Sequence, residues 1–160
     1  MDNPASKILT KQYLSAAGWG NWIIGALSED DLKKEISPGK NHGVWLLGHL
    51  ITCEDDFALY MGKGEITYPE YQKMFAEGTK PLSFDNYPLL SEMKSKWKEM
   101  VDKNKKIYAE LTDEELEQPH AQLTDENDFC QTKKDICVHW QVHLMYHVGQ
   151  LSVLIAKAKS

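Results

Sequence analysis

The chain has 160 residues, 42% of them hydrophobic and 26% charged, which is enough for one domain with a single buried core and too few for two. Its net charge of −6 comes with basic residues scattered along the chain, so no basic stripe is available to neutralise phosphates, and nucleic acid is not an expected partner. No apolar run approaches the ~20 residues needed to cross a bilayer, and the first residues lack the pattern of a signal peptide. We therefore expect a single cytoplasmic domain over residues 1–160, with no membrane partner.

The first half of the chain predicts two long helices joined by a short helical turn. The first spans 4–27, where Asn3-Pro4 supplies an N-cap and a first-turn proline and apolar residues recur at helical spacing. A capping box that begins at Ser28 opens the short turn. The second long helix begins near Asn41 and ends before Gly62.

The middle of the chain predicts a long crossover and a third long helix. Weak periodicity over 63–81 indicates the crossover, with one helical turn near Tyr68 to Phe75. Asp85-Asn86 ahead of Pro88 signals the start of the third helix, whose apolar pattern continues to Leu111.

The last part of the chain predicts a polar loop and a fourth long helix. The loop covers Pro119 to Gln131, and a capping box at Thr132 opens a helix that runs to about Ala156. No strand-like alternation occurs in the sequence. Four long amphipathic helices without a sheet predict an all-α four-helix bundle, with a long crossover between the second and third helices.

Four of the six histidines lie inside predicted helices, and their spacing indicates a metal site. His143 and His147 are four residues apart, so they stack on one face of the fourth helix and can direct both imidazoles at a common centre. His49, in a core-contacting stretch of the second helix, can supply a third ligand from another helix. Neutral imidazole is the commonest transition-metal ligand. The sequence therefore predicts one divalent ion on these three histidines.

Two glycines bear on this interpretation, because Gly48 precedes His49 and Gly149 follows His147 by two residues. Each costs ~1 kcal/mol in a helix interior relative to alanine. That cost is easiest to explain if the helices approach closely around an ion or leave room there for a substrate. The competing interpretation is a hydrogen-bonded core histidine, which is the commoner role for an isolated histidine on an apolar face.

The other histidines and the cysteines have simpler interpretations. His139 is displaced ~80° around the helix from the last histidine, so we expect it to line the pocket. His42, near a helix start, and His120, in a loop, are expected at the solvated surface. The three cysteines form an odd set without a Cys-x-x-Cys pair, which predicts reduced thiols. Cys53 lies one turn beyond the second-helix histidine and could face the ion, but a small buried apolar role is favoured.

Missing motifs exclude several enzyme classes. A zincin protease needs a glutamate inside its histidine pair, and here Leu144, Met145 and Tyr146 stand there. The sequence also lacks a Gly-x-Ser-x-Gly elbow, a phosphate-binding loop and the paired Glu-x-x-His motifs of a di-iron bundle. One ion fits better than two.

Two segments resemble signatures of the DinB/YfiT-like metalloenzyme superfamily. Its helix-two signature is similar to Val44-Trp45-Leu46-Leu47-Gly48-His49-Leu50, with Glu54 five residues after the histidine. Its helix-four signature is similar to His139-Trp140-Gln141-Val142-His143-Leu144-Met145-Tyr146-His147-Val148-Gly149-Gln150-Leu151. Helix order, crossover and length match as well, so the resemblance covers nearly the whole chain.

The resemblance implies a four-helix bundle of up-up-down-down order, often dimeric, with a histidine triad that falls on His49, His143 and His147. The expected cofactor is one divalent ion per chain, zinc or nickel. Members of the superfamily include transferases that use bacillithiol, mycothiol or glutathione, and a mycothiol-dependent isomerase, so a low-molecular-weight thiol is a candidate cosubstrate. The founding member's DNA-damage name implies no DNA binding.

Two functions stay open. In the first, the protein is an enzyme whose ion keeps a position for a water or a thiolate, and it carries out thiol transfer or metal-assisted hydrolysis of a small molecule. In the second, it is a non-catalytic metal or small-ligand binding protein whose ion braces the bundle, and a fourth ligand such as Cys53 would favour this role. We also expect a homodimer, because Trp19, Trp22, Trp97 and Trp140 supply more aromatic surface than a small bundle usually hides.

Overall fold

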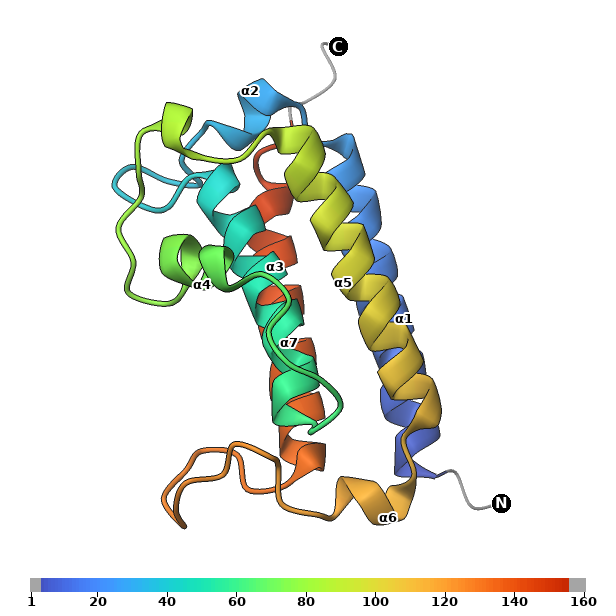
Figure 1. The fold of residues 1–160 in the computed structure, drawn as a ribbon. Helices are drawn as coiled ribbons and strands as arrows, with labels where there is room; N and C mark the ends of the chain where they lie inside the picture. The colour runs from blue at the N-terminus through green and yellow to red at the C-terminus, as the bar shows by residue number, and fades with distance from the viewer. Residues whose placement is uncertain (1–3, 156–160) are drawn as a thin grey trace.

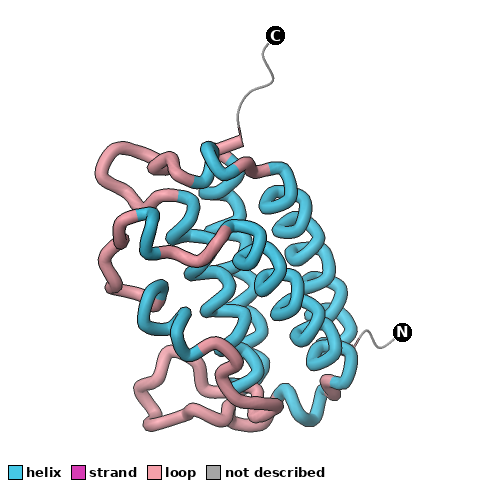
Figure 2. The backbone as a smooth tube through the Cα atoms, turned by 45° about the horizontal axis from the view of Figure 1, so that its top comes forward, coloured by secondary structure: helices cyan, strands magenta, loops and turns pink. Residues whose placement is uncertain are grey.

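A computed structural model describes residues 4–155 of the chain (Figures 1 and 2). The predicted all-α class is confirmed, and no strand occurs among the described residues (Figure 2). Two predicted helix signals, the N-cap at Asn3 and the helix end near Ala156, lie outside this range.

Four long helices make up the bundle: α1 (Ala5–Ala26), α3 (Gly43–Tyr60), α5 (Leu90–Glu110) and α7 (Lys133–Ser152). Both α1 and α3 pack against α5 and against α7. The helices that carry the predicted ligands, α3 and α7, are therefore direct neighbours.

The long helices run up, down, down and up when they are followed by colour in Figure 1. This corrects the up-up-down-down order that the resemblance implies. The connection over residues 27–42 stays at one end of the bundle (Figure 1), so the chain reverses direction between α1 and α3. The crossover predicted over 63–81 lies within the connection 61–89, which returns along the bundle and makes α3 and α5 parallel.

Three short helices and a 3-10 turn complete the fold: α2 (Glu29–Leu32), α4 (Pro69–Phe75), α6 (Asp113–Leu116) and η1 (Phe84–Asn86). The capping box predicted at Ser28 opens α2, with Asp31 as its second member. The helical turn predicted within the crossover is α4, which packs on α3.

Two helix ends differ from the prediction. α5 begins at Leu90 rather than near Pro88, because the backbone is still extended at Leu89, the N-cap residue, with φ of −58° and ψ of 140°. α7 ends at Ser152, where the following N–H groups bond carbonyls three residues back and tighten the last turn.

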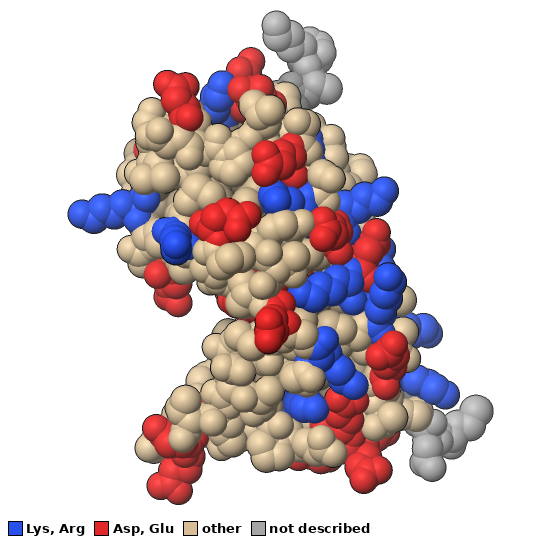
Figure 3. Space-filling view, viewed as in Figure 1, with Lys and Arg blue, Asp and Glu red and all other residues tan. Residues whose placement is uncertain are grey.

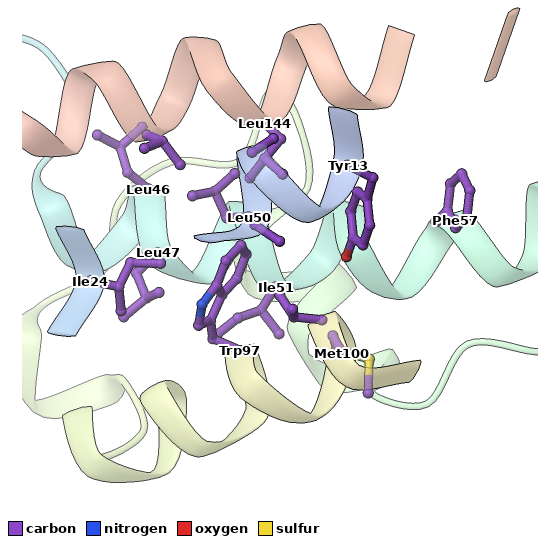
Figure 4. Packing of buried hydrophobic residues seen from close by; sticks show 14 of the residues in the cluster. Tyr13, Ile24, Leu46, Leu47, Leu50, Ile51, Phe57, Trp97, Met100 and Leu144 are labelled. Carbon is purple, nitrogen blue, oxygen red and sulfur yellow. The ribbon is translucent and has the colours of Figure 1, made fainter. Parts of the chain in front are cut away.

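The core is one apolar cluster between the long helices (Figure 4). α3 is buried nearly all round because α4, α5 and α7 cover it. Leu47, Leu50 and Ile51 are at most 1% exposed, and burying each contributes about 1.5–3 kcal/mol relative to leaving it exposed. Rotation of α3 is therefore strongly restricted, and this fixes the direction in which His49 points.

Candidate metal site

Three histidine side chains from α3 and α7 converge on one point. The Nε2 atom of His143 lies 3.3 Å from Nε2 of His49 and 3.0 Å from Nε2 of His147. His143 and His147 are one turn apart on α7, and His49 comes from the neighbouring α3. The structure thus brings the three predicted ligands together.

Two of the three imidazoles are hydrogen-bonded through Nδ1, the ring nitrogen that does not face the other histidines. His49 Nδ1 lies 2.8 Å from the backbone oxygen of Phe75, and because a carbonyl can only accept, Nδ1 carries the proton. His147 Nδ1 lies 2.7 Å from the side-chain oxygen of Gln150, and the same reasoning applies. Each ring then presents an unprotonated Nε2 to the common point, as metal-ligating histidines do.

All three rings favour the neutral form. Burial, followed by the charges of neighbouring histidines, lowers the pKa of His143 to about 3. Burial also lowers the pKa of His49 and of His147. At neutral pH the imidazole lone pairs are therefore not blocked by protonation, which is a requirement for binding a metal.

The separations of the nitrogen atoms fit a tetrahedral ion. Zinc bonds imidazole nitrogen at about 2.0–2.1 Å, so two such nitrogens on a tetrahedral ion are about 3.4 Å apart. The separations of 3.3 and 3.0 Å in this group are close to that value. These two distances, from His143 to each of the other histidines, are compatible with a divalent ion of the kind that the sequence predicts.

Cys53 offers a fourth donor atom beside the histidines. Its Sγ lies 3.6 Å from His49 Nε2, and the donor atoms of His49, Cys53 and His143 all lie within 4.8 Å of one another. This His-Cys-His group could hold a metal ion. Burial, followed by nearby carboxylates, raises the pKa of the Cys53 thiol well above its usual value. Cys53 is half-buried beside His49, so the ligand role that the sequence left open for it stays a prediction alongside the favoured apolar role.

α4 fixes the orientation of His49. Gly48 faces the ring of Phe75, and a Cβ atom at this glycine would lie 2.3 Å from that ring. The missing side chain lets α4 come close enough for the Phe75 carbonyl to reach His49 Nδ1. Trp45 stacks on the same imidazole with ring centroids 4.8 Å apart. Gly149 faces open space, so the close approach predicted there is absent.

A cavity of about 210 Å³ opens beside the histidines. His49, Cys53 and His143 line it, so a small molecule inside can reach the candidate ligands. Tyr60 and Trp140 form an aromatic wall, with ring centroids 4.9 Å apart. Figure 3 shows the molecular surface hollowed on the side where α4 and the loop before α7 project.

A comparison of sequences places this architecture in a family. The profile of the DinB superfamily matches residues 21–151, a range that contains all three histidines. The chain belongs to the DinB superfamily. The family resemblance drawn from the two histidine segments is thereby confirmed.

A solved structure shares the DinB fold of this chain. The crystal structure of the conserved protein of locus from Enterococcus faecalis matches with a TM-score of 0.64 and 13% sequence identity, over 96% of this chain and 98% of that chain. Identity that low shows a common fold alone. No curated protein matches the chain.

Two histidines of this DinB-superfamily chain differ from the prediction. His42 is buried and caps α3, where its Nδ1 accepts the backbone N–H of Trp45 at 3.1 Å. His120 is buried too, with its Nε2 2.9 Å from the backbone oxygen of Cys130. Both were expected at the solvated surface, but each ring is tied to the backbone instead. His139 lies at the edge of the cavity, in line with its expected role.

The acidic residue of the family signature points away from the histidines. Glu54 is buried between helices, where Tyr13 Oη donates to it at 2.6 Å and Asn104 Nδ2 at 2.8 Å. Burial raises the pKa of this carboxyl group. It braces the core of the DinB bundle and is absent from the cavity lining.

Two further features can be stated for the described part of the chain. Cys53, Cys130 and Cys137 are free, as the sequence predicts. None of its helices combines the length and the apolar character that a membrane span requires.

Proposed function

We propose that this member of the DinB superfamily is a metal-dependent enzyme that holds one divalent ion on His49, His143 and His147. The observation that carries the proposal is the pair of anchored rings: two imidazoles are fixed through Nδ1 so that each Nε2 faces His143 Nε2 beside an open cavity. Zinc and nickel are the proposed metals.

The reaction that we favour is transfer of a small thiol, with metal-assisted hydrolysis as the second choice. When bound, the ion would supply Lewis acidity, which lowers the pKa of a water or thiol that joins it. The chain itself supplies three neutral donors, and the cavity of about 210 Å³ is suited to a small molecule rather than a polymer.

A second candidate function follows from Cys53. Nitrogen and sulfur ligands of a tetrahedral zinc ion lie about 3.6 Å apart, and Cys53 Sγ lies 3.6 Å from His49 Nε2. If its thiolate completes the tetrahedron, the ion is structural and the protein binds metal without catalysis. Cobalt substitution separates the two, because a cysteine ligand adds a sulfur-to-cobalt charge-transfer band that Cys53→Ala removes.

Metal analysis tests the proposed site. Untagged wild-type protein is expected to carry close to one divalent ion per chain, and His147→Ala is expected to lose it. His139→Ala is the matched control, because this exposed histidine lies on the same helix at the edge of the cavity. Equal metal content in wild type and His147→Ala would contradict the assignment.

A thiol screen with the metal-loaded protein then tests the reaction. We expect turnover of an electrophile with at least one of bacillithiol, mycothiol, glutathione and coenzyme A. A metal-loaded protein that reacts with none of them would favour hydrolysis or the non-catalytic role.

A further inference from the structure

The cavity beside the histidines is acidic. Asp56 and Glu77 line it, and none of the lysines among residues 4–155 does. Neither carboxylate forms an ion pair with any residue over 4–155. Asp56 is half-buried, and the hydrogen bond that the structure shows for it comes from the amide of Gln72, with Nε2 2.6 Å from Oδ1.

The two acidic residues that precede Asp56 on α3 both have partners elsewhere in the bundle. Glu54, Asp55 and Asp56 are consecutive. Glu54 accepts hydrogen bonds from Tyr13 and Asn104. Asp55 forms an ion pair with Lys103, whose Nζ lies 3.2 Å away, and accepts hydrogen bonds from backbone N–H groups of the crossover. Asp56 alone of the three turns its charge into the cavity without a cation.

The two unpaired carboxylates act electrostatically on the candidate ligands. Both raise the pKa of the Cys53 thiol, after burial, and Glu77 also acts on His49. They line the same cavity of about 210 Å³ as His49 and His143, so one small molecule can touch the histidine group and the acidic wall together. The aromatic wall of Tyr60 and Trp140 offers further attraction to a cation, because ring faces carry negative potential.

We propose that the substrate of this site is an aminothiol, a small molecule whose sulfur faces the three histidines while its ammonium group binds Asp56 and Glu77. The proposal rests on the proposed function, because the sulfur is assigned to the metal end of the cavity. A carboxylate or phosphate at the position of the ammonium group would meet two like charges, so this wall selects against thiols that place an anionic group there.

Binding of three thiols that share the HS–CH2–CH2 chain tests this proposal. Cysteamine, 2-mercaptoethanol and 3-mercaptopropionate differ at one end, which is positive, neutral or negative. Calorimetric titration of the zinc-loaded protein is expected to rank cysteamine first and 3-mercaptopropionate last, with about two- to fivefold between cysteamine and 2-mercaptoethanol, the range of a solvent-screened ion pair.

The three probes differ in thiol acidity as well as in charge. Variants of the two carboxylates separate these effects, because a substitution in the protein leaves the acidity of each probe unchanged. Asp56→Asn keeps an oxygen for Gln72, and Glu77→Gln is nearly isosteric, so we expect both to retain zinc and to lose most of the preference for cysteamine. Glu70→Gln is the matched control, because this exposed acid lies on α4 outside the cavity and its replacement changes the net charge equally. The control should keep the wild-type ranking.

The outcomes separate the two levels of the proposal. An unchanged preference for cysteamine in Asp56→Asn and Glu77→Gln overturns the aminothiol assignment, while thiol binding itself leaves the proposed function standing. Failure of every thiol to bind the zinc-loaded wild type overturns the thiol reaction and the aminothiol assignment with it.

Discussion

At the residue scale, we predict that Cys53 is dispensable for thiol transfer. A thiol bound at the histidine group is activated there, whereas burial raises the pKa of Cys53, and the base beside it, His49 Nε2, is a proposed metal ligand. Turnover of monochlorobimane with a reactive thiol should stay within a few-fold in Cys53→Ala, and should be abolished in His49→Ala or His143→Ala. Loss of activity in Cys53→Ala alone would mean that the protein supplies the nucleophile.

His143 and His147 could be placed together from the sequence, because residues four apart on a helix share a face whatever surrounds them. Their connection to His49 needed only the expectation that α3 and α7 pack. The hydrogen-bond partners of the rings could not be predicted: the Phe75 carbonyl comes from a crossover with weak periodicity, 26 residues after His49. The surface positions predicted for His42 and His120 were wrong for a similar reason, since their burial depends on backbone partners and on packing that local sequence does not encode.

His42 predicts a pH dependence of stability. Burial lowers the pKa of His42 from 6.5, and its Nδ1 must be unprotonated to accept the N–H of Trp45. The unfolded chain therefore binds the proton more readily, so this contribution is present above pH 6.5 and is lost as the pH falls below it. The loss should amount to about 1 kcal/mol, the usual worth of an N-cap.

Urea unfolding of the metal-free protein at pH 7.5 and 5.5 measures this contribution. His42→Asn is the comparison, because asparagine also caps helices and does not titrate. We expect the free energy of unfolding to fall less between the two pH values in His42→Asn than in wild type. Equal falls in the two proteins would show that His42 does not titrate on unfolding.

At the element scale, α4 is expected to hold His49 in place for the metal. Gly48→Ala puts a methyl group against the Phe75 ring and should displace α4, with a loss of about 1–3 kcal/mol in the free energy of unfolding. Because the Phe75 carbonyl then leaves His49 Nδ1, zinc affinity should fall about 10–100-fold.

Gly149→Ala is the control for this prediction. It makes the same change in α7, two residues from His147, but a Cβ there has open space. Competitive zinc titration of both variants gives the comparison, and we expect Gly149→Ala to bind as wild type does. A Gly48→Ala protein with wild-type zinc affinity would show that α4 does not position the ligand.

At the scale of the whole molecule, we propose a homodimer that uses the exposed side of α1 and α7. Trp97 is buried and Trp140 donates to the Cys53 carbonyl, so these two of the four tryptophans that suggested a dimer have roles inside one chain. Trp19 and Trp22 are 55% and 62% exposed on α1, and α7, which packs beside α1, exposes Val142 and Tyr146 at 61% and 62%. Exposed apolar surface of this kind marks interaction sites.

Light scattering at micromolar concentrations should give the mass of two chains for wild type. Trp22→Glu places a charge in the proposed interface and should weaken the dimer about thirtyfold or more, as loss of an aromatic anchor does. Phe129→Glu is the control, because this residue is equally apolar and 86% exposed but lies in the loop before α7. A monomeric wild type, or equal weakening by both substitutions, would contradict the proposed interface.

The packing of the whole bundle brings α3 and α7 together, and the central proposal is that these two helices jointly hold a divalent ion through three imidazoles. X-ray absorption of the zinc-loaded protein at the zinc edge tests it most directly, because the scattering reports the ligand atoms themselves. We expect nitrogen neighbours of the zinc ion at about 2.0–2.1 Å, with the outer-shell pattern of three imidazoles. A spectrum without imidazole scattering, or one unchanged in His143→Ala, would contradict it.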